Sequence, residues 1–73
     1  MKKPKRIELI EKGESGHREI NVHFKSGTVI NIWPCYESWM QSVTNHSGNE
    51  TLWDTVEIAD QYNDWLHGGE LPE

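Results

Sequence analysis

The clearest pattern along the chain is a strict alternation of apolar and polar residues over positions 19–25. Alternate side chains of an extended strand point to opposite faces, so the apolar residues here share one face: Ile20, Val22 and Phe24. The pattern therefore predicts a strand that is buried on one side. A shorter alternation predicts an earlier strand over Ile7–Glu11, and the glycines within residues 12–17 predict a flexible connection between the two strands.

The next apolar run, residues 28–33, predicts a third strand, and its pattern distinguishes two lengths for the turn before it. A two-residue turn would place Asn31 among the core residues. A three-residue turn keeps every core position on one face, and it pairs Phe24 with Thr28, Val22 with Ile30 and Ile20 with Ile32. The three-residue turn is therefore favoured, and it requires Gly27 in a left-handed conformation. Trp33 then lies on the polar face, where it is either covered by another element or available to a partner.

Residues 35–44 are compatible with two structures. Because Pro34 has no backbone N–H, we expect the third strand to end or bulge at Trp33. Side chains then alternate over positions 39–43 as in a fourth strand, but Ser38 is also suited to cap a short helix. The β-branched and aromatic residues of this segment favour the strand.

The last segment carries concordant signals for a helix. Thr51 and Asp54 have the spacing of a capping box, and Gly68 with Gly69 marks the end of the helix. At about 100° per residue, half of the circumference is apolar and is expected to face the sheet: Leu52, Val56, Ile58, Ala59, Tyr62, Trp65 and Leu66. The other half is expected to face solvent: Trp53, Asp54, Glu57, Asp60, Gln61 and Asp64.

These elements predict one small α+β domain. We expect an antiparallel meander of three strands, or four if residues 35–44 are extended, packed against one C-terminal amphipathic helix. The 73 residues suffice for a single domain. Residues 1–6 are interpreted as a flexible basic arm, residues 7–68 as the domain and residues 69–73 as a tail.

Charge divides the chain into two parts. All seven Lys and Arg residues lie in the first 25 positions beside four acids, which gives 7 − 4 = +3. From Glu37 onward there are eight Asp and Glu residues and no Lys or Arg, which gives −8 and accounts for the net charge of −5. The acidic part should repel nucleic acid and attract basic partners.

The residues that usually carry chemistry are isolated in this sequence. A single cysteine, Cys35, cannot close an internal disulfide, and no Cys or His pair has the spacing of a zinc site. We therefore predict no metal, no cofactor and no catalytic residue, and a non-enzymatic protein. No apolar run is long enough to span a membrane, and one unpaired thiol suits a reducing compartment, so we expect a cytoplasmic location.

The acidic outer face of the predicted helix is the main candidate for a binding site. Its acids would form a line of negative charge along the helix, and an exposed Trp would anchor a contact with a basic protein surface. The candidate partner-binding residues are Trp53, Asp54, Glu57, Asp60, Asp64 and Trp33. The same acids are also what an ordinary solvated helix face carries. The alternatives are a nucleic-acid binder that uses the basic arm and the sheet, which the net charge disfavours, and a homodimer joined through strand edges or outer sheet faces.

The run Gly27–Pro34, followed by Trp39, resembles a hairpin motif of small phage and prophage proteins, which carry Asn-x-Trp-Pro and a second Trp a few residues later. The intervening Cys35-Tyr36-Glu37-Ser38 differs from the Thr-Thr-Gly-Lys turn that is common there. The resemblance implies no activity and no functional residue. It implies an accessory protein of a phage or other mobile element, and such proteins often bind and block a host protein.

Overall fold

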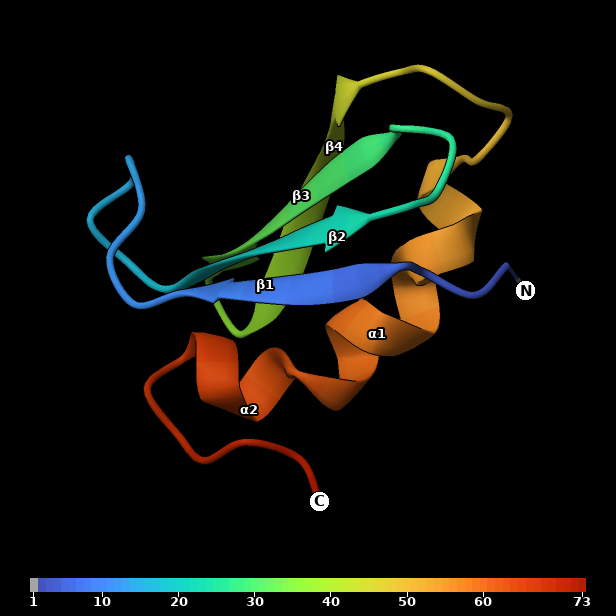
Figure 1. The fold of residues 1–73 in the computed structure, drawn as a ribbon. Helices are drawn as coiled ribbons and strands as arrows, with labels where there is room; N and C mark the ends of the chain where they lie inside the picture. Colours follow the sequence, from blue (N-terminus) through green and yellow to red (C-terminus); the bar gives the residue numbers. More distant parts are fainter. Residues whose placement is uncertain (1) are drawn as a thin grey trace.

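The computed structural model describes residues 2–73 and shows a four-stranded antiparallel sheet with short helical segments on one side (Figure 1). The strands are β1 (Arg6–Ile10), β2 (Glu19–His23), β3 (Val29–Cys35) and β4 (Ser38–Asn45). They pair in the order β1-β2-β3-β4. The predicted α+β class and the meander are confirmed, and residues 38–45 form the fourth strand.

The β2–β3 register follows the apolar pattern. Val22 lies opposite Ile30, and Ile20 lies opposite Ile32, as the three-residue turn predicts. The backbone N–H of Phe24 donates to the Thr28 carbonyl at 3.0 Å, which closes the hairpin. Gly27 has a φ of 98°, the left-handed conformation that the turn requires.

The expectation that β3 ends or bulges at Trp33 is wrong, because the strand continues through Pro34 to Cys35. Along an antiparallel strand, the backbone N–H and C=O groups of successive residues point alternately to the neighbouring strand on one side and on the other. Because Thr28 bonds to Phe24, the backbone groups of the even-numbered residues of β3 point toward β2. The β2 ladder ends at Ile32. The proline nitrogen therefore points to a position that no strand occupies, and its missing N–H removes no ladder bond.

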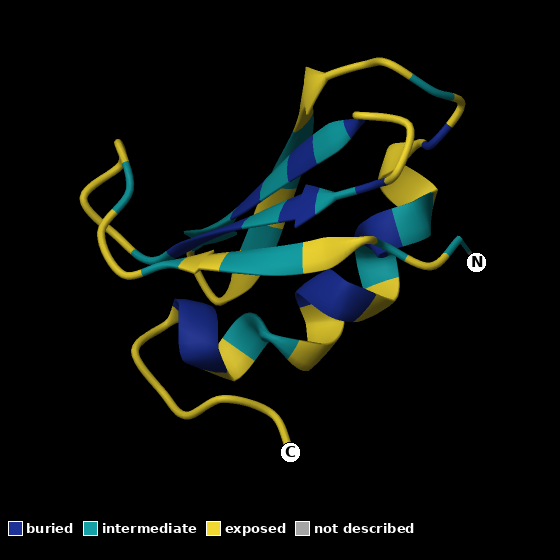
Figure 2. Cartoon of the chain, in the orientation of Figure 1, coloured by how far each residue is buried: buried dark blue, intermediate teal, exposed yellow. Residues whose placement is uncertain are grey.

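The core lies between the central strands and the helical segments. Figure 2 shows buried residues along β2 and β3 and on the helices. The buried apolar residues come from both layers: Ile20, Val22, Phe24, Ile30, Ile32, Ile58, Ala59, Trp65 and Leu66. Burial of each large side chain contributes roughly 1.5–3 kcal/mol, so this cluster supplies most of the stabilisation.

The C-terminal region is three short segments and not the one continuous helix that the pattern predicts. They are η1 (Leu52–Thr55), a 3₁₀-helix, followed by α1 (Val56–Gln61) and α2 (Asn63–Leu66). The Asp54 carboxylate accepts the Thr51 backbone N–H at 2.8 Å, as the capping box predicts. After α2 the chain turns at Gly68, which has a φ of 93°, and the Gly69 N–H donates to the Asp64 carbonyl at 2.8 Å. The predicted stop is confirmed.

The first turn departs from the predicted helix face. Leu52 is 38% exposed and does not join the core, whereas Thr55 is fully buried. A 3₁₀-helix has three residues per turn, so the faces assigned at 3.6 residues per turn do not apply here. The Thr55 hydroxyl donates to the Gln41 side-chain carbonyl at 2.5 Å, and the Gln41 amide donates to the Leu52 carbonyl at 2.8 Å. These bonds fix η1 beside β4.

Arg18 fixes the other end of the helical region. One guanidinium nitrogen, Nη1, donates to the carbonyls of Trp65 and Gly69, each at 2.9 Å. The guanidinium carbon lies 4.9 Å from the centre of the Trp65 ring, within cation–π range. A positive charge at the end of α2 also complements the helix dipole. Arg18 therefore attaches the C-terminal segment to the start of β2.

Candidate partner-binding surface

The six candidate residues lie on two different sides of the molecule. Trp53, Asp54, Glu57, Asp60 and Asp64 lie on the helical segments. Trp33 follows Ile32, whose side chain is in the core, so Trp33 lies on the opposite face of the sheet. It is paired there with Met40 of β4. The five helical residues therefore lie along the helical segments, with Asp60 toward β4 and Glu57 beside Lys2 and Lys3, and Trp33 is separated from them by the sheet.

Trp53 is the one tryptophan that solvent largely surrounds. Its exposed fraction is 83%, whereas Trp65 is buried and the other two tryptophans are half-buried. The negative charges around it come from its own segment and the next, with Asp54 in η1 and Glu57 in α1. An aromatic side chain of this size is costly to expose, so its position is a candidate anchor for a partner.

Two of the acids also hold the fold together. Asp54 caps η1 through the Thr51 N–H, as described above. The Asp60 carboxylate accepts the indole N–H of Trp39 at 2.8 Å, which joins α1 to β4. Neither bond neutralises the carboxylate. Glu57 and Asp64 are exposed and have no hydrogen-bond or ion-pair partner within residues 2–73.

The strand beside these acids is an open edge of the sheet. Within the described residues, β4 pairs with β3 on one side and has no strand on the other. The eight residues of β4, Ser-Trp-Met-Gln-Ser-Val-Thr-Asn, include no charged residue and no proline. At the start of this strand, a ring nitrogen of His67, the residue after α2, lies 2.7 Å from the Ser38 carbonyl.

Tyr36 precedes β4 and was missed as a candidate in the sequence. It is 97% exposed and has a φ of 52°, the one positive φ of a non-glycine residue within residues 2–73. Only Tyr36 and Glu37 separate the paired residues Cys35 and Ser38, so the turn has two residues. Two-residue turns of this kind need a positive φ, and in most sequences a glycine or an asparagine marks that position. This turn has neither, so nothing in the sequence indicated it.

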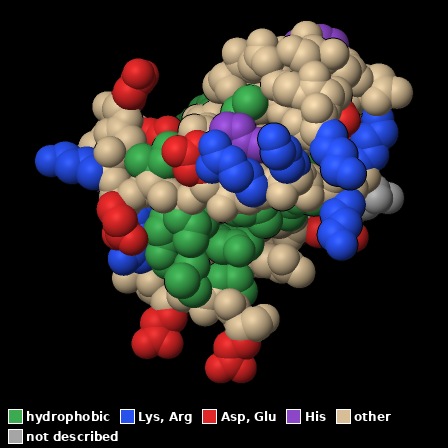
Figure 3. All heavy atoms as spheres, viewed as in Figure 1, with side chains coloured by type: hydrophobic (Ala, Val, Ile, Leu, Met, Phe, Trp, Pro, Cys, Tyr) green, Lys and Arg blue, Asp and Glu red, His purple; other side chains and the backbone are tan. Residues whose placement is uncertain are grey.

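Several of the basic residues gather near the N-terminus, beside β1 (Figure 3). Figure 3 shows the β1 side of the molecule, where Lys and Arg side chains gather near the N-terminus and a hydrophobic area lies below the strand. The Lys5 N–H donates to the His23 carbonyl at 2.7 Å, and the Lys2 ammonium donates to the Asn49 side chain. The two parts of the charge pattern are not fully separated in space, because Lys2 and Lys3 line a hollow together with Glu57 of α1.

The outer face of the sheet is polar at its centre. Asn31 donates to the Asn21 side chain at 2.9 Å and to the buried Glu19 carboxylate at 3.1 Å. Glu19 also accepts the Ser15 hydroxyl at 2.9 Å and the Ser15 N–H at 3.2 Å. Burial raises the pKa of Glu19, but the bonds from Ser15 and Asn31 together outweigh it and hold the pKa below the usual 4.5. The network orders the connection between β1 and β2.

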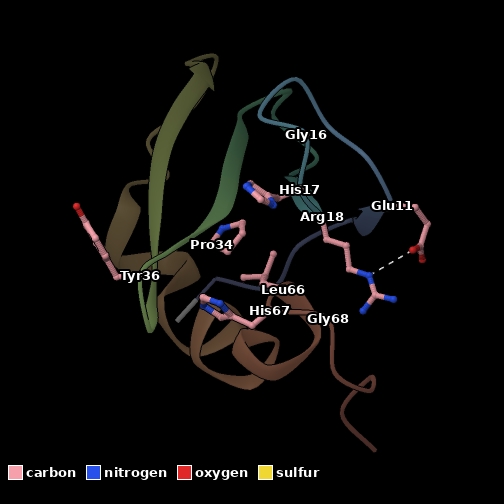
Figure 4. Close-up of a pocket in the computed structure, with 9 residues that line it drawn as sticks. All are labelled: Glu11, Gly16, His17, Arg18, Pro34, Tyr36, Leu66, His67 and Gly68. Atoms are coloured by element: carbon pink, nitrogen blue, oxygen red, sulfur yellow. Dashed lines mark hydrogen bonds and ion pairs between the residues drawn. The ribbon is translucent and has the colours of Figure 1, made fainter.

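A hollow of about 540 Å³ opens where the helical region ends against the sheet (Figure 4). Two of its polar side chains already have structural partners, because Arg18 bonds to the Glu11 carboxylate at 3.3 Å and to two carbonyls, and His67 lies against Ser38. The Tyr36 side chain points away from it. The residues that line it are Glu11, Gly16, His17, Arg18, Pro34, Tyr36, Leu66, His67 and Gly68.

Within residues 2–73, no three His, Cys, Asp or Glu side chains lie close enough together to hold a metal ion. No helix in the same range has the length and apolar character that a membrane crossing requires. No known protein family, curated protein or solved structure matches the chain.

Proposed function

We propose that this protein is a non-enzymatic binding module whose acidic helical side docks on a basic surface of another protein. The observation that carries the proposal is the 83% exposure of Trp53 among acids, in a part of the chain without Lys or Arg. A large aromatic side chain anchors a contact, and the surrounding acids select a partner of opposite charge. The surface is defined here as Trp53, Asp54, Glu57, Asp60 and Asp64.

The phage-like hairpin motif supports a more specific proposal. A small accessory protein of a phage or mobile element would bind a host protein in the cytoplasm and inhibit or modulate it. A basic host surface that normally holds nucleic-acid phosphates fits an acidic ligand of this kind. Binding would then compete with the nucleic acid.

The test is retention of proteins from a host lysate on the immobilised chain at about 50 mM and about 500 mM salt. Trp53→Ala should reduce retention. The combined variant Glu57→Gln, Asp60→Asn and Asp64→Asn should reduce it and weaken its salt dependence. Asn at position 60 keeps an oxygen for the Trp39 N–H, so the bond between α1 and β4 is preserved.

The matched control removes the same charge elsewhere. Glu14, Glu70 and Glu73 are exposed and lie outside the helical segments, and their replacement by Gln changes the net charge equally. Retention should be largely unaffected in this control. Equal retention by the wild type, the helix-face variant and Trp53→Ala, with all of them folded by circular dichroism, would show that the proposed surface is not used.

A further inference from the structure

The two edges of the sheet differ in how they are protected. An open strand edge invites pairing with another chain, and proteins block it with charge, proline or short length. Strand β1 has five residues, carries Arg6 and Glu8, and follows Pro4 and a group of lysines. Strand β4 has eight residues and none of these features. The edge at β4 is therefore the one that is open to strand addition.

The backbone groups that β4 presents can be assigned from the ladder. The Phe24–Thr28 bond shows that the backbone N–H and C=O groups of even-numbered residues in β3 point toward β2. The backbone groups of its odd-numbered residues therefore bond to β4. From Asn31 to Cys35 their partners in β4 are even-numbered, and the ladder shifts register only beyond Ile30. The N–H and C=O groups of Trp39, Gln41 and Val43 therefore point away from the sheet, and no hydrogen bond within residues 2–73 occupies them. They extend over roughly 14 Å, which suits about five residues of an extended chain.

Exposed apolar side chains lie along this edge. Met40 is 49% exposed on the outer face of β4, and Tyr36 stands just before the strand. On the helical side, the Gln41 bond to the Leu52 carbonyl places the neighbouring Trp53 near the middle of the strand. A chain that pairs with β4 would find apolar contacts on both of its faces, as strand-addition sites provide.

Charge decides which chain fits. Asp60 is bonded to Trp39 of the edge itself, and Asp54 belongs to the segment that Gln41 holds. No Lys or Arg occurs after Lys25. Pairing of β4 with β4 of a second copy would bring two such acidic sides together, and the repulsion opposes it. An extended segment with Lys or Arg residues has the complementary charge.

We propose that β4 binds an extended, Lys- or Arg-containing segment of a partner protein as a fifth strand, with Trp53 and Tyr36 beside it. This proposal rests on the proposed function and specifies how the acidic side holds its partner. Backbone bonds to Trp39, Gln41 and Val43 supply affinity, and the acids select the sequence.

The first experiment uses a display library of random linear peptides, about twelve residues long, panned against the folded protein. The most enriched peptide is then synthesised as the probe. Lys and Arg should be enriched in the selected peptides. Enrichment of acidic or purely apolar peptides would overturn the proposed chemistry of the partner.

The second experiment tests the backbone bonds without changing the protein. Two versions of the probe carry N-methyl groups on alternate residues, one on the odd and one on the even positions. Only one set of N–H groups faces β4 in a strand, so one version should lose at least about tenfold in affinity and the other should bind like the parent. Equal affinity of both versions would exclude strand addition.

The protein variant Val43→Pro supplies the matching change on the edge. It removes an outward N–H, breaks no bond to β3 and leaves the charge unchanged. Probe affinity should fall at least about tenfold, and the amides of Trp39 and Gln41 should be protected from hydrogen exchange only when the wild type holds the probe. The control is Thr44→Ser, at the irregularity of the ladder.

The outcomes separate the two proposals. If basic peptides bind, Trp53→Ala weakens them and both N-methyl series bind equally, the acidic surface is used and the edge is not. If the peptides are not basic and the helix-face variant retains host proteins as the wild type does, both proposals fail. If, without peptide, sedimentation shows that the wild type is a dimer and that Val43→Pro is a monomer, β4 pairs with a second copy of the chain. The proposal of a basic partner segment is then wrong.

Discussion

Replacement of Arg18 by methionine is expected to destabilise the domain by about 2 kcal/mol. Arg18 joins the start of β2 to the end of α2 through two hydrogen bonds of 2.9 Å and a stacked Trp65 ring. Methionine preserves much of the apolar stem and removes the charged group. The change therefore measures the bonds of the guanidinium and not the loss of a packed side chain.

The magnitude follows from these contacts. Two charge-assisted bonds contribute roughly 1.5 kcal/mol each and the cation–π contact about 0.5–1 kcal/mol. The Arg18 side chain is 27% exposed, so water recovers part of this sum and about 2 kcal/mol remains. A domain of this size has a total stability of roughly 4–11 kcal/mol. The melting temperature should therefore fall by roughly 8–16 °C.

The assay is urea unfolding followed by tryptophan fluorescence, with thermal melting as a second measurement. Arg18→Lys should fall between the wild type and Arg18→Met, because an ammonium retains the charge but lacks the planar fork of donors. The control is Arg6→Met, because Arg6 is exposed and lies 3.9 Å from Glu8, and it should cost less than about 0.5 kcal/mol. If Arg18→Met costs no more than Arg6→Met, the assigned role of Arg18 is wrong.

Two further predictions concern the turn before β4 and the outer face. Tyr36→Gly should leave the free energy of unfolding unchanged or raise it by up to about 1 kcal/mol. Glycine adopts a φ of 52° without strain, and the tyrosine side chain that is lost is almost fully exposed. A clear decrease in the urea midpoint would show that Tyr36 has a structural contact. The folded-state pKa of Glu19 lies below 4.5, so its ionised form stabilises the fold above pH 4.5, and this contribution is lost as the pH falls through the lowered value. Glu19→Gln should therefore destabilise the protein at pH 7, and the difference from the wild type should shrink toward pH 3 in the same urea assay; a difference independent of pH would contradict the assignment.

The sequence was informative where a local pattern and a tertiary contact impose the same requirement. The β2–β3 register could be predicted because only one turn length places Val22 opposite Ile30, and the capping box at Thr51 is a local bond. Pro34 shows the limit of this reasoning. Whether its missing N–H matters depends on where β2 ends, which no feature of β3 reveals.

The candidate surface was predictable as a set of helical acids but not as a site. Its composition follows from the sequence, and so does the position of Trp33 on the face opposite the core, whereas the bond from Trp39 to Asp60 depends on the β4 register. The open edge of β4 could not be predicted, because the sequence of residues 35–44 is compatible with a helix as well as with a strand. The role of Arg18 was also hidden, because a charge count does not show which carbonyls a guanidinium reaches.

An open β4 edge beside acids would also attract β1 of a second copy, which lies near the lysines. Such pairing uses different surfaces on the two copies, so it does not close and would extend into a filament. Strand β1 opposes it, because it is only five residues long, follows Pro4 and carries Arg6 and Glu8. Glu8 is held by His23 at 2.8 Å and would add negative charge beside Asp60 and the rest of the acidic side. A basic segment without an acid or a proline should therefore bind β4 more tightly than β1 of another copy does, which leaves the edge available to a partner.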